Sequence, residues 1–112
     1  MKLSEAIRQG CKIARKKTTG ELFSWNKNNK LEAACILGAG ILGSCTNIKL
    51  KFGGPNDEAW ETFKAKYPVL YHQFKNPKDE IQEQLVDILV HLNDDWDMER
   101  YQIVRWLERQ GL

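Results

Sequence analysis

Apolar residues recur every three or four positions along much of the chain, which is the period of an amphipathic helix. This period predicts helices over residues 4–17, 79–93 and 97–109. A further helix is expected from Asn56 or Asp57 to about Lys66, with a short one beginning at Pro68. We expect the last helix to bury a stripe of its apolar side chains. They are Tyr101, Val104 and Leu107, with either Ile103 or Trp106.

Two segments have a different pattern. In residues 48–52, apolar residues alternate with lysines, as they do in a short half-buried strand. Residues 22–25 can form a short extended piece, and Gly53–Asn56 reads as a turn. The sequence therefore allows a small two-stranded element near residues 22–25 and 48–52.

The glycine-rich stretch Ala33–Gly43 supports two interpretations. Gly38, Gly40 and Gly43 have the G-x-G-x-x-G spacing of a dinucleotide-binding turn. That turn needs a following helix of a dozen or so residues, and Cys45–Ile48 has poor helix propensity. The rest of the chain also lacks the alternating strands and helices of a parallel sheet.

The second interpretation is one buried helix. Apolar residues keep a single helical register from Leu31 to Cys45 and cover every face, which is typical of a central helix. On this interpretation, which we favour, the glycines are positions where another helix comes close. Replacing Gly38 with leucine should then unfold or badly destabilise the protein.

Together these patterns predict a mainly α fold. We expect residues 1–112 to form a single globular domain, a compact bundle of about five helices around the buried central helix. At most a small two-stranded β element is expected beside it. A hydrophobic content of 42% with 29% charged residues suits such a globule.

The length of the apolar runs and the cysteine count bear on location. The longest apolar run, Ala33–Gly43, is shorter than the roughly 20 residues of a membrane span, so no membrane partner is expected. Glu5 stands where a secretory signal would need apolar residues. The three cysteines are an odd number, which speaks against a disulfide framework. We therefore expect a cytoplasmic protein.

Charge is divided unequally between the two halves. Residues 1–54 carry ten Lys/Arg and three Asp/Glu (net +7), whereas residues 55–112 carry seven and twelve (net −5). Such a split can mark an interaction surface, or a fold that pairs its own halves. The candidates for binding a protein partner, or alternatively a nucleic acid, are the basic residues of the first half. They are Arg8, Lys12, Arg15, Lys16, Lys49 and Lys51.

Candidate catalytic and metal-binding residues are few. Cys35, His91 and Asp94 supply the residue types of a thiol hydrolase, but we expect Cys35 to lie inside an apolar helix as a core residue. His72 has no second ligand at metal spacing, and we expect no metal or cofactor. These residues favour a non-enzymatic protein and leave the question of an enzyme open.

Four motifs carry a family resemblance. They are M-K-L-S-E-A-I-R-x-G at the start, C-x-L-G-A at Cys35–Ala39, H-L-N-D at His91–Asp94 and I-V-R-W-L-E at Ile103–Glu108. In this order they resemble a loose family of small uncharacterised bacterial and prophage proteins. Members often carry a C-P-x-C pair before the C-terminal helices, and here Tyr67–Pro77 has no cysteine. Any metal role of that pair therefore does not transfer, and the resemblance implies no activity.

From these observations we expect a small intracellular binding or regulatory protein, associated with phage through the resemblance, that acts through protein–protein contacts. The alternative is a nucleic-acid-binding protein that uses the basic N-terminal half. A thiol hydrolase built on Cys35 and His91 is the third hypothesis. The oligomeric state does not follow from the sequence.

Overall fold

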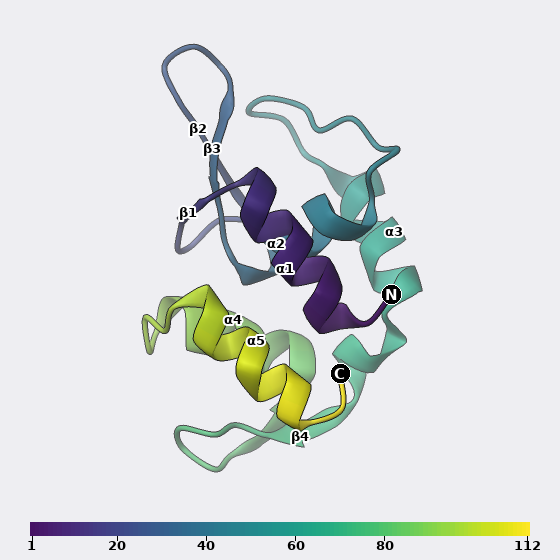
Figure 1. Cartoon of the computed structure of the whole chain (residues 1–112), viewed down its shortest axis with the longest axis vertical. Coiled ribbons are helices and arrows are strands. Elements are labelled where there is room, and N and C mark those ends of the chain that lie inside the picture. Colours follow the sequence, from purple (N-terminus) through teal and green to yellow (C-terminus); the bar gives the residue numbers. More distant parts are fainter.

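The computed structural model describes residues 1–112 and contains both helices and short strands (Figure 1). Three strands follow the first helix, and two more follow η1. The helices are α1 (Leu3–Ile13), α2 (Ile36–Ser44), α3 (Asp57–Lys66), the 3₁₀ helix η1 (Pro68–Tyr71), α4 (Leu85–Asp94) and α5 (Arg100–Arg109). The strands are β1 (Lys16–Lys17), β2 (Phe23–Trp25), β3 (Leu31–Ala34), β4 (Gln73–Lys75) and β5 (Gln82–Gln84).

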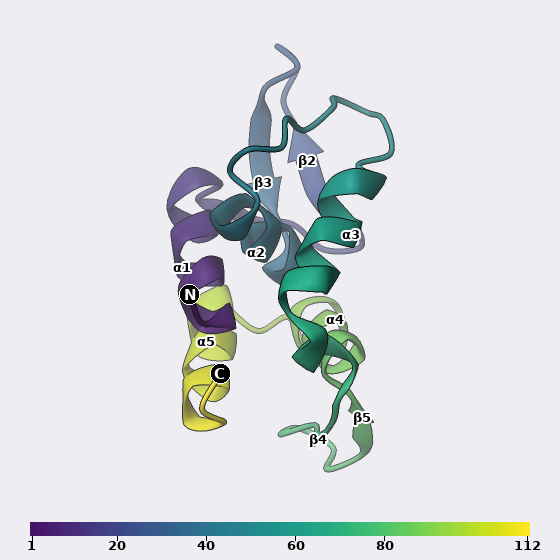
Figure 2. The same ribbon diagram turned by 90° about the vertical axis from the view of Figure 1, so that its right-hand side faces the viewer.

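The prediction of a helical bundle is wrong, because the fold is α+β. Its three-stranded sheet has the order β1-β3-β2, with β1 parallel and β2 antiparallel to the central β3. An antiparallel pair, β4 and β5, lies at the other end of the molecule (Figure 2). Each strand has only two to four residues, too few to show a period in the sequence.

The segment before the glycines accounts for the main error. Leu31–Ala34 is a strand, with Phe23 paired to Ala34 and Lys16 paired to Ala33. The backbone of Cys35 is still extended (φ −74°, ψ −179°), so α2 begins only at Ile36. A four-residue segment with three apolar residues fits a strand and a helix equally well, and its pairing with β1 and β2 decides for the strand.

The predicted two-stranded element is correct on one side only. Residues 23–25 form β2, but β2 pairs with β3, and residues 48–52 form an irregular loop. The two segments still meet through their side chains. The rings of Trp25 and Phe52 lie edge to face with their centroids 5.8 Å apart.

Helices α1 and α2 pack closely enough for their backbones to touch. A Cβ atom on Gly43 would overlap the carbonyl group of Ala6, and one on Gly10 would overlap that of Ala39. Because the earlier residue of α1 meets the later residue of α2, these contacts show that the two helices run antiparallel. A Cβ atom on Gly40 would lie 2.6 Å from the ring of Phe63 in α3. The prediction that glycines mark close helix approaches is confirmed at Gly40 and Gly43.

Gly38 is crowded for a different reason. A Cβ atom on Gly38 would overlap the carbonyl oxygen of Leu22. Leu22 lies in the segment that leads into β2, so the close neighbour of Gly38 is not a helix. All three glycines of the G-x-G-x-x-G spacing lie inside α2, after the helix has begun, and a phosphate-binding turn would place them before it.

The C-terminal helices bury the apolar stripes that the sequence predicts, with two exceptions, of which the first is Ile81, predicted to be part of the stripe over residues 79–93 but 56% exposed and outside α4. Leu85, Ile88, Leu89 and Leu92 of α4, and Ile103, Val104, Trp106 and Leu107 of α5, are buried. Tyr101, predicted to be buried, is 55% exposed. The helices also start later than predicted, at Leu85 and Arg100, because Gln82–Gln84 pairs with β4 and Glu99 caps α5. None of the helices combines the length and the apolar character that a bilayer crossing requires.

Two buried polar side chains join the C-terminal helices to the three-stranded sheet. Asn93, at the end of α4, accepts a hydrogen bond from the backbone N–H of Ile36 (3.1 Å) and donates one to the carbonyl oxygen of Thr18 (3.0 Å). Arg100, at the start of α5, donates to the carbonyl oxygens of Ala34 (3.2 Å) and Arg15 (2.6 Å). These bonds fix where α5 lies relative to α1.

Candidate functional site

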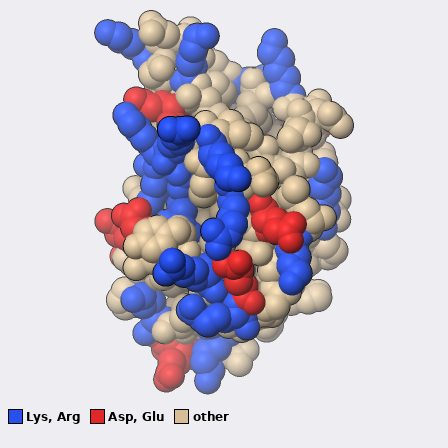
Figure 3. All heavy atoms as spheres, viewed as in Figure 1, with Lys and Arg blue, Asp and Glu red and all other residues tan.

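A groove of about 510 Å³ runs between α1 and α5 on the face seen in Figure 1. Its walls come from both helices. From α1 and the residues just after it they are Arg8, Cys11, Lys12 and Arg15, and from α5 with its cap they are Glu99, Arg100, Tyr101 and Val104. Lys and Arg side chains cover much of this face in the space-filling view (Figure 3).

The two helices run antiparallel along the groove. At one end, the backbone N–H of Ser4 donates to the carbonyl oxygen of Leu112 (3.2 Å), and Arg8 pairs with Glu108 at 2.6 Å. At the other end, Arg100 donates to the carbonyl oxygen of Arg15. The groove therefore lies along residues 8–15 and 99–104, between hydrogen bonds that join the two segments.

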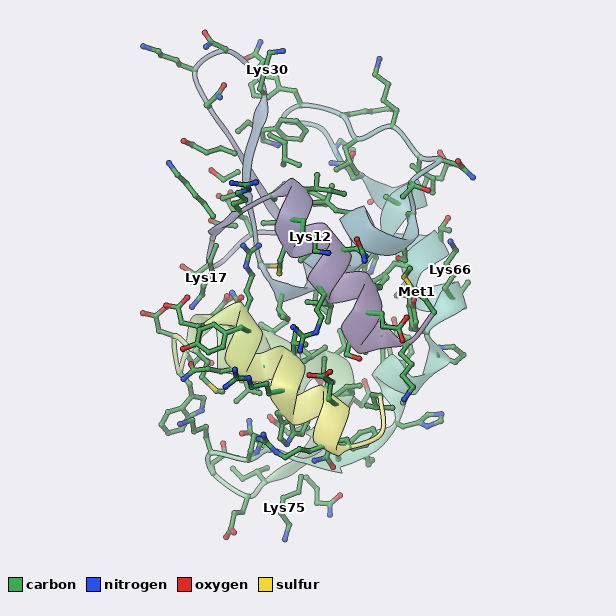
Figure 4. The ribbon with its side chains drawn as sticks, viewed as in Figure 1. Met1, Lys12, Lys17, Lys30, Lys66 and Lys75 are labelled. Carbon is green, nitrogen blue, oxygen red and sulfur yellow. The ribbon has the colours of Figure 1, made fainter.

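The basic wall follows only in part from residue spacing on α1. Arg8 and Lys12 stand four positions apart on one helix face, whereas Arg15 lies beyond Ile13, where the helix ends, and reaches the same wall from the extended segment that follows. Arg8 is half exposed and has its ion pair with Glu108, whereas Lys12 and Arg15 are exposed and form no ion pair. Lys12 lies in the last turn of α1 (Figure 4). Two positive charges at the groove are therefore free for a ligand.

The opposite wall supplies an aromatic ring and little free negative charge. Tyr101 is more than half exposed, and the guanidinium of Arg105 lies 5.4 Å from the centre of its ring. Glu99 is the one acidic residue of the groove, and its side chain accepts a backbone hydrogen bond in the capping box that begins α5. Cys11 and Val104 make the groove partly apolar.

The structure assembles half of the predicted basic residues. Arg8, Lys12 and Arg15 line the groove together. Lys16 lies outside it on β1, where it forms an exposed ion pair with Glu32 at 3.3 Å. Lys49 and Lys51 lie on the loop between α2 and α3. The sequence pattern missed Tyr101 as a groove residue, although its spacing of four from Arg105 is a sign of an exposed helix pair.

Cys35 is not inside a helix, contrary to the prediction. It is the N-cap of α2, is 8% exposed, and its Sγ accepts a hydrogen bond from the backbone N–H of Gly38 at 3.4 Å. Burial raises the pKa of its thiol, more than the backbone hydrogen bonds from Gly38 and Leu37 lower it. A thiol with a raised pKa is a poor nucleophile near neutral pH.

The other two candidates for a thiol hydrolase do not complete a site. A hollow of about 190 Å³ brings Cys35 together with Asn93 and Asp94, but His91 is not among its lining residues. The His91 Nδ1 atom instead lies 2.9 Å from a carboxylate oxygen of Glu83. Asp94 accepts a hydrogen bond from Asn93 at 2.6 Å. The hollow beside the cysteine therefore holds no histidine that could act as its base.

Buried thiols make the stability of the fold depend on alkaline pH. Burial raises the pKa of Cys11 and of Cys35, so the folded state keeps both protons to a higher pH than the unfolded chain does. Their stabilising contribution is complete below the pKa of a free thiol, about 8.5, and is lost as pH rises above it. We expect the free energy of unfolding, measured with urea, to fall between about pH 8 and pH 10.

A single-cysteine variant assigns this pH dependence. Cys35→Ala removes one of the two shifted thiols and should give a shallower fall over the same pH range. Tyr67, whose pKa burial also raises, contributes a similar fall near its ordinary value of about 10 in both proteins. Parallel curves for the variant and the wild type would show that Cys35 does not contribute.

Comparisons with protein-family models, with curated proteins and with solved structures found no match to this chain. The family resemblance therefore stays a prediction based on its motifs. Two of those motifs touch in the structure, because Asn93 of H-L-N-D accepts the hydrogen bond from Ile36 of C-I-L-G-A.

Proposed function

We propose that this chain is a non-enzymatic binding protein whose α1/α5 groove holds an acidic segment of a protein partner. The observation that carries the proposal is the row formed by Arg8, Lys12 and Arg15 along one wall of the groove. Its charge is complementary to carboxylates, and charge complementarity of this kind sets partner choice and association rate. The motif resemblance adds the proposal that the partner belongs to a bacterial or prophage system in the cytoplasm.

The chemistry of the groove suits a peptide chain. Tyr and Arg are the residues most enriched at the centres of protein interfaces, and the groove presents Tyr101 opposite Arg8 and Arg15. The wall from Arg8 to Arg15 spans at most about 14 Å, with five helical steps of about 1.5 Å to Ile13 and two extended steps of about 3.3 Å after it. An extended segment covers that length with about five residues. A short run of Asp and Glu with an apolar residue among them therefore fits the groove.

Reversing the two unpaired charges tests the proposal. The double variant Lys12→Glu, Arg15→Glu should weaken binding of a fluorescein-labelled acidic peptide at least about tenfold, because two attractive contacts become repulsive. Fluorescence anisotropy at physiological salt measures the affinity. We expect the wild-type affinity to fall with added salt, since the contacts are exposed.

A matched variant separates this effect from net charge. Lys75→Glu, Lys78→Glu changes the charge equally on the β4/β5 hairpin, and Lys75 lies far from Lys12 in Figure 4. This control should bind the peptide as the wild type does. Equal loss in both variants, or no binding by the wild type, would refute the groove as the site.

A further inference from the structure

Two loops meet at the end of the molecule opposite the β4/β5 hairpin. One is the loop between β2 and β3, and the other is the loop between α2 and α3 (Figures 1 and 2). Their contact is the edge-to-face packing of Trp25 on Phe52. We call the surface formed by Trp25, Lys27, Lys30, Lys49, Lys51 and Phe52 the apical surface.

Both loops are held in shape by an asparagine side chain. The side-chain oxygen of Asn26 accepts hydrogen bonds from the backbone N–H groups of Asn28 (2.8 Å) and Lys30 (3.2 Å). In the second loop, the side-chain oxygen of Asn56 accepts one from the backbone of Lys51 at 2.7 Å. The lysines of the apical surface are therefore presented on ordered turns.

The apical surface has positive charge that the fold does not neutralise. Lys27, Lys30, Lys49 and Lys51 are all exposed, and none of them forms an ion pair. Between residues 22 and 56 the chain has one acidic residue, Glu32, which pairs with Lys16. Asp57 and Glu58, in the first turn of α3, line a hollow together with Lys49 and Lys51 and offset part of their charge, although neither forms an ion pair with them.

An aromatic ring stands among these lysines. Phe52 is 54% exposed, and the loop that carries it also exposes Lys49 and Lys51. Because Phe52 meets Trp25 edge to face, part of its ring surface is free. Basic side chains that follow a phosphate backbone, beside an aromatic ring on which a base can stack, are the features of proteins that bind single strands.

We infer that the apical surface binds single-stranded nucleic acid, with the lysines on phosphates and Phe52 stacked on a base. This site is separate from the α1/α5 groove and goes beyond the function proposed for it. A duplex fits less well, because its bases are already stacked on one another. An anionic membrane also fits less well, because the loops carry Asn26, Asn28, Asn29 and Asn47, which are costly to move into hydrocarbon.

The test is fluorescence anisotropy with a labelled oligothymidylate of about 15 nucleotides, a length within the range that single-strand binding folds cover. We expect binding that weakens with salt, with a logarithmic slope of about −3 if the four lysines each contact a phosphate. Phe52→Ala should weaken binding about tenfold, and Phe52→Trp should retain it. Lys49→Glu, Lys51→Glu should abolish binding at about 150 mM salt.

Matched measurements make each outcome decisive. The groove variant (Lys12→Glu, Arg15→Glu) and the hairpin variant (Lys75→Glu, Lys78→Glu) should both bind the oligonucleotide as the wild type does. Loss of peptide binding at the groove can then be distinguished from loss of oligonucleotide binding at the apical surface. All variants should unfold at the wild-type temperature, since the changed side chains are exposed. Three results would each overturn the inference. They are equal affinity for a hairpin duplex, unchanged binding of the oligonucleotide by Phe52→Ala, and binding to phosphatidylserine vesicles, in place of the oligonucleotide, that depends on Phe52.

Discussion

Gly43→Ala is expected to destabilise the protein by about 3 kcal/mol or more, although alanine is the better helix former. In an exposed helix this change would stabilise by up to about 1 kcal/mol. Here the added methyl group would overlap the carbonyl group of Ala6 and come within 2.9 Å of the backbone nitrogen of Gly10. Backbone atoms of a packed helix cannot rotate away, so α1 and α2 must separate. Urea denaturation followed by circular dichroism measures the loss.

Gly54→Ala is the matched control for this prediction. The nearest atom to a Cβ there is 3.5 Å away, on Lys51, and the residue lies in a loop. The control should retain wild-type stability within about 0.5 kcal/mol. Gly38→Leu should behave like Gly43→Ala or worse, because its side chain would overlap the carbonyl group of Leu22. Wild-type stability in Gly43→Ala would mean that α1 and α2 are not in backbone contact.

The sequence predicted the elements whose cause is local. A turn signal and a proline bound α3, and its observed limits, Asp57 and Lys66, match the expected ones. The apolar stripe of α4 needs only the residues of α4 itself. Helix α2 was recognised because apolar residues surround the glycines, which a phosphate-binding turn does not require. In each case neighbours in the sequence are enough to decide the structure.

The strands could not be predicted in the same way, because distant residues decide them. Leu31–Ala34 continues the helical register of α2, but its backbone hydrogen bonds go to β1 on one side and β2 on the other. Residues 48–52 alternate as a strand does, yet they form no strand beside the open edge of β2 and meet it only through the Trp25–Phe52 side-chain contact. Alternation indicates that a strand could form, whereas pairing decides whether it does.

The candidate site was predicted on one wall only. Arg8 and Lys12 share a face of α1, so their spacing places them together, and Arg15 joins them from the segment after the helix ends at Ile13. The opposite wall depends on which face α5 buries. The apolar pattern of α5 predicts the wrong face at Arg100, because an arginine is not expected to be buried. Arg100 occupies an inward position because two backbone carbonyl oxygens accept its hydrogen bonds. That register turns Tyr101 outward into the groove.

Asn93→Leu is expected to cost about 3–4 kcal/mol, even though leucine has nearly the same shape and is more apolar. Asn93 is fully buried, and its side chain serves the N–H of Ile36 and the carbonyl oxygen of Thr18. Leucine would leave both groups without that partner, at about 1–3 kcal/mol each. The burial of the more apolar leucine side chain offsets only part of this loss of stability, because the N–H of Ile36 at the start of α2 no longer has its hydrogen-bond acceptor.

The amide of Ile36 reports this loss directly. In the wild type it is bonded to Asn93, and in Asn93→Leu its hydrogen exchange should accelerate more than that of amides in the middle of α2, which keep their bonds within the helix. Asn47→Leu changes an exposed asparagine in the loop after α2 and should alter neither stability nor exchange. If Asn93→Leu exchanged and unfolded like the wild type, the bond from α4 would not hold the start of α2. The geometry of the groove would then rest on the Arg100 hydrogen bonds at one end and on the Ser4–Leu112 and Arg8–Glu108 contacts at the other.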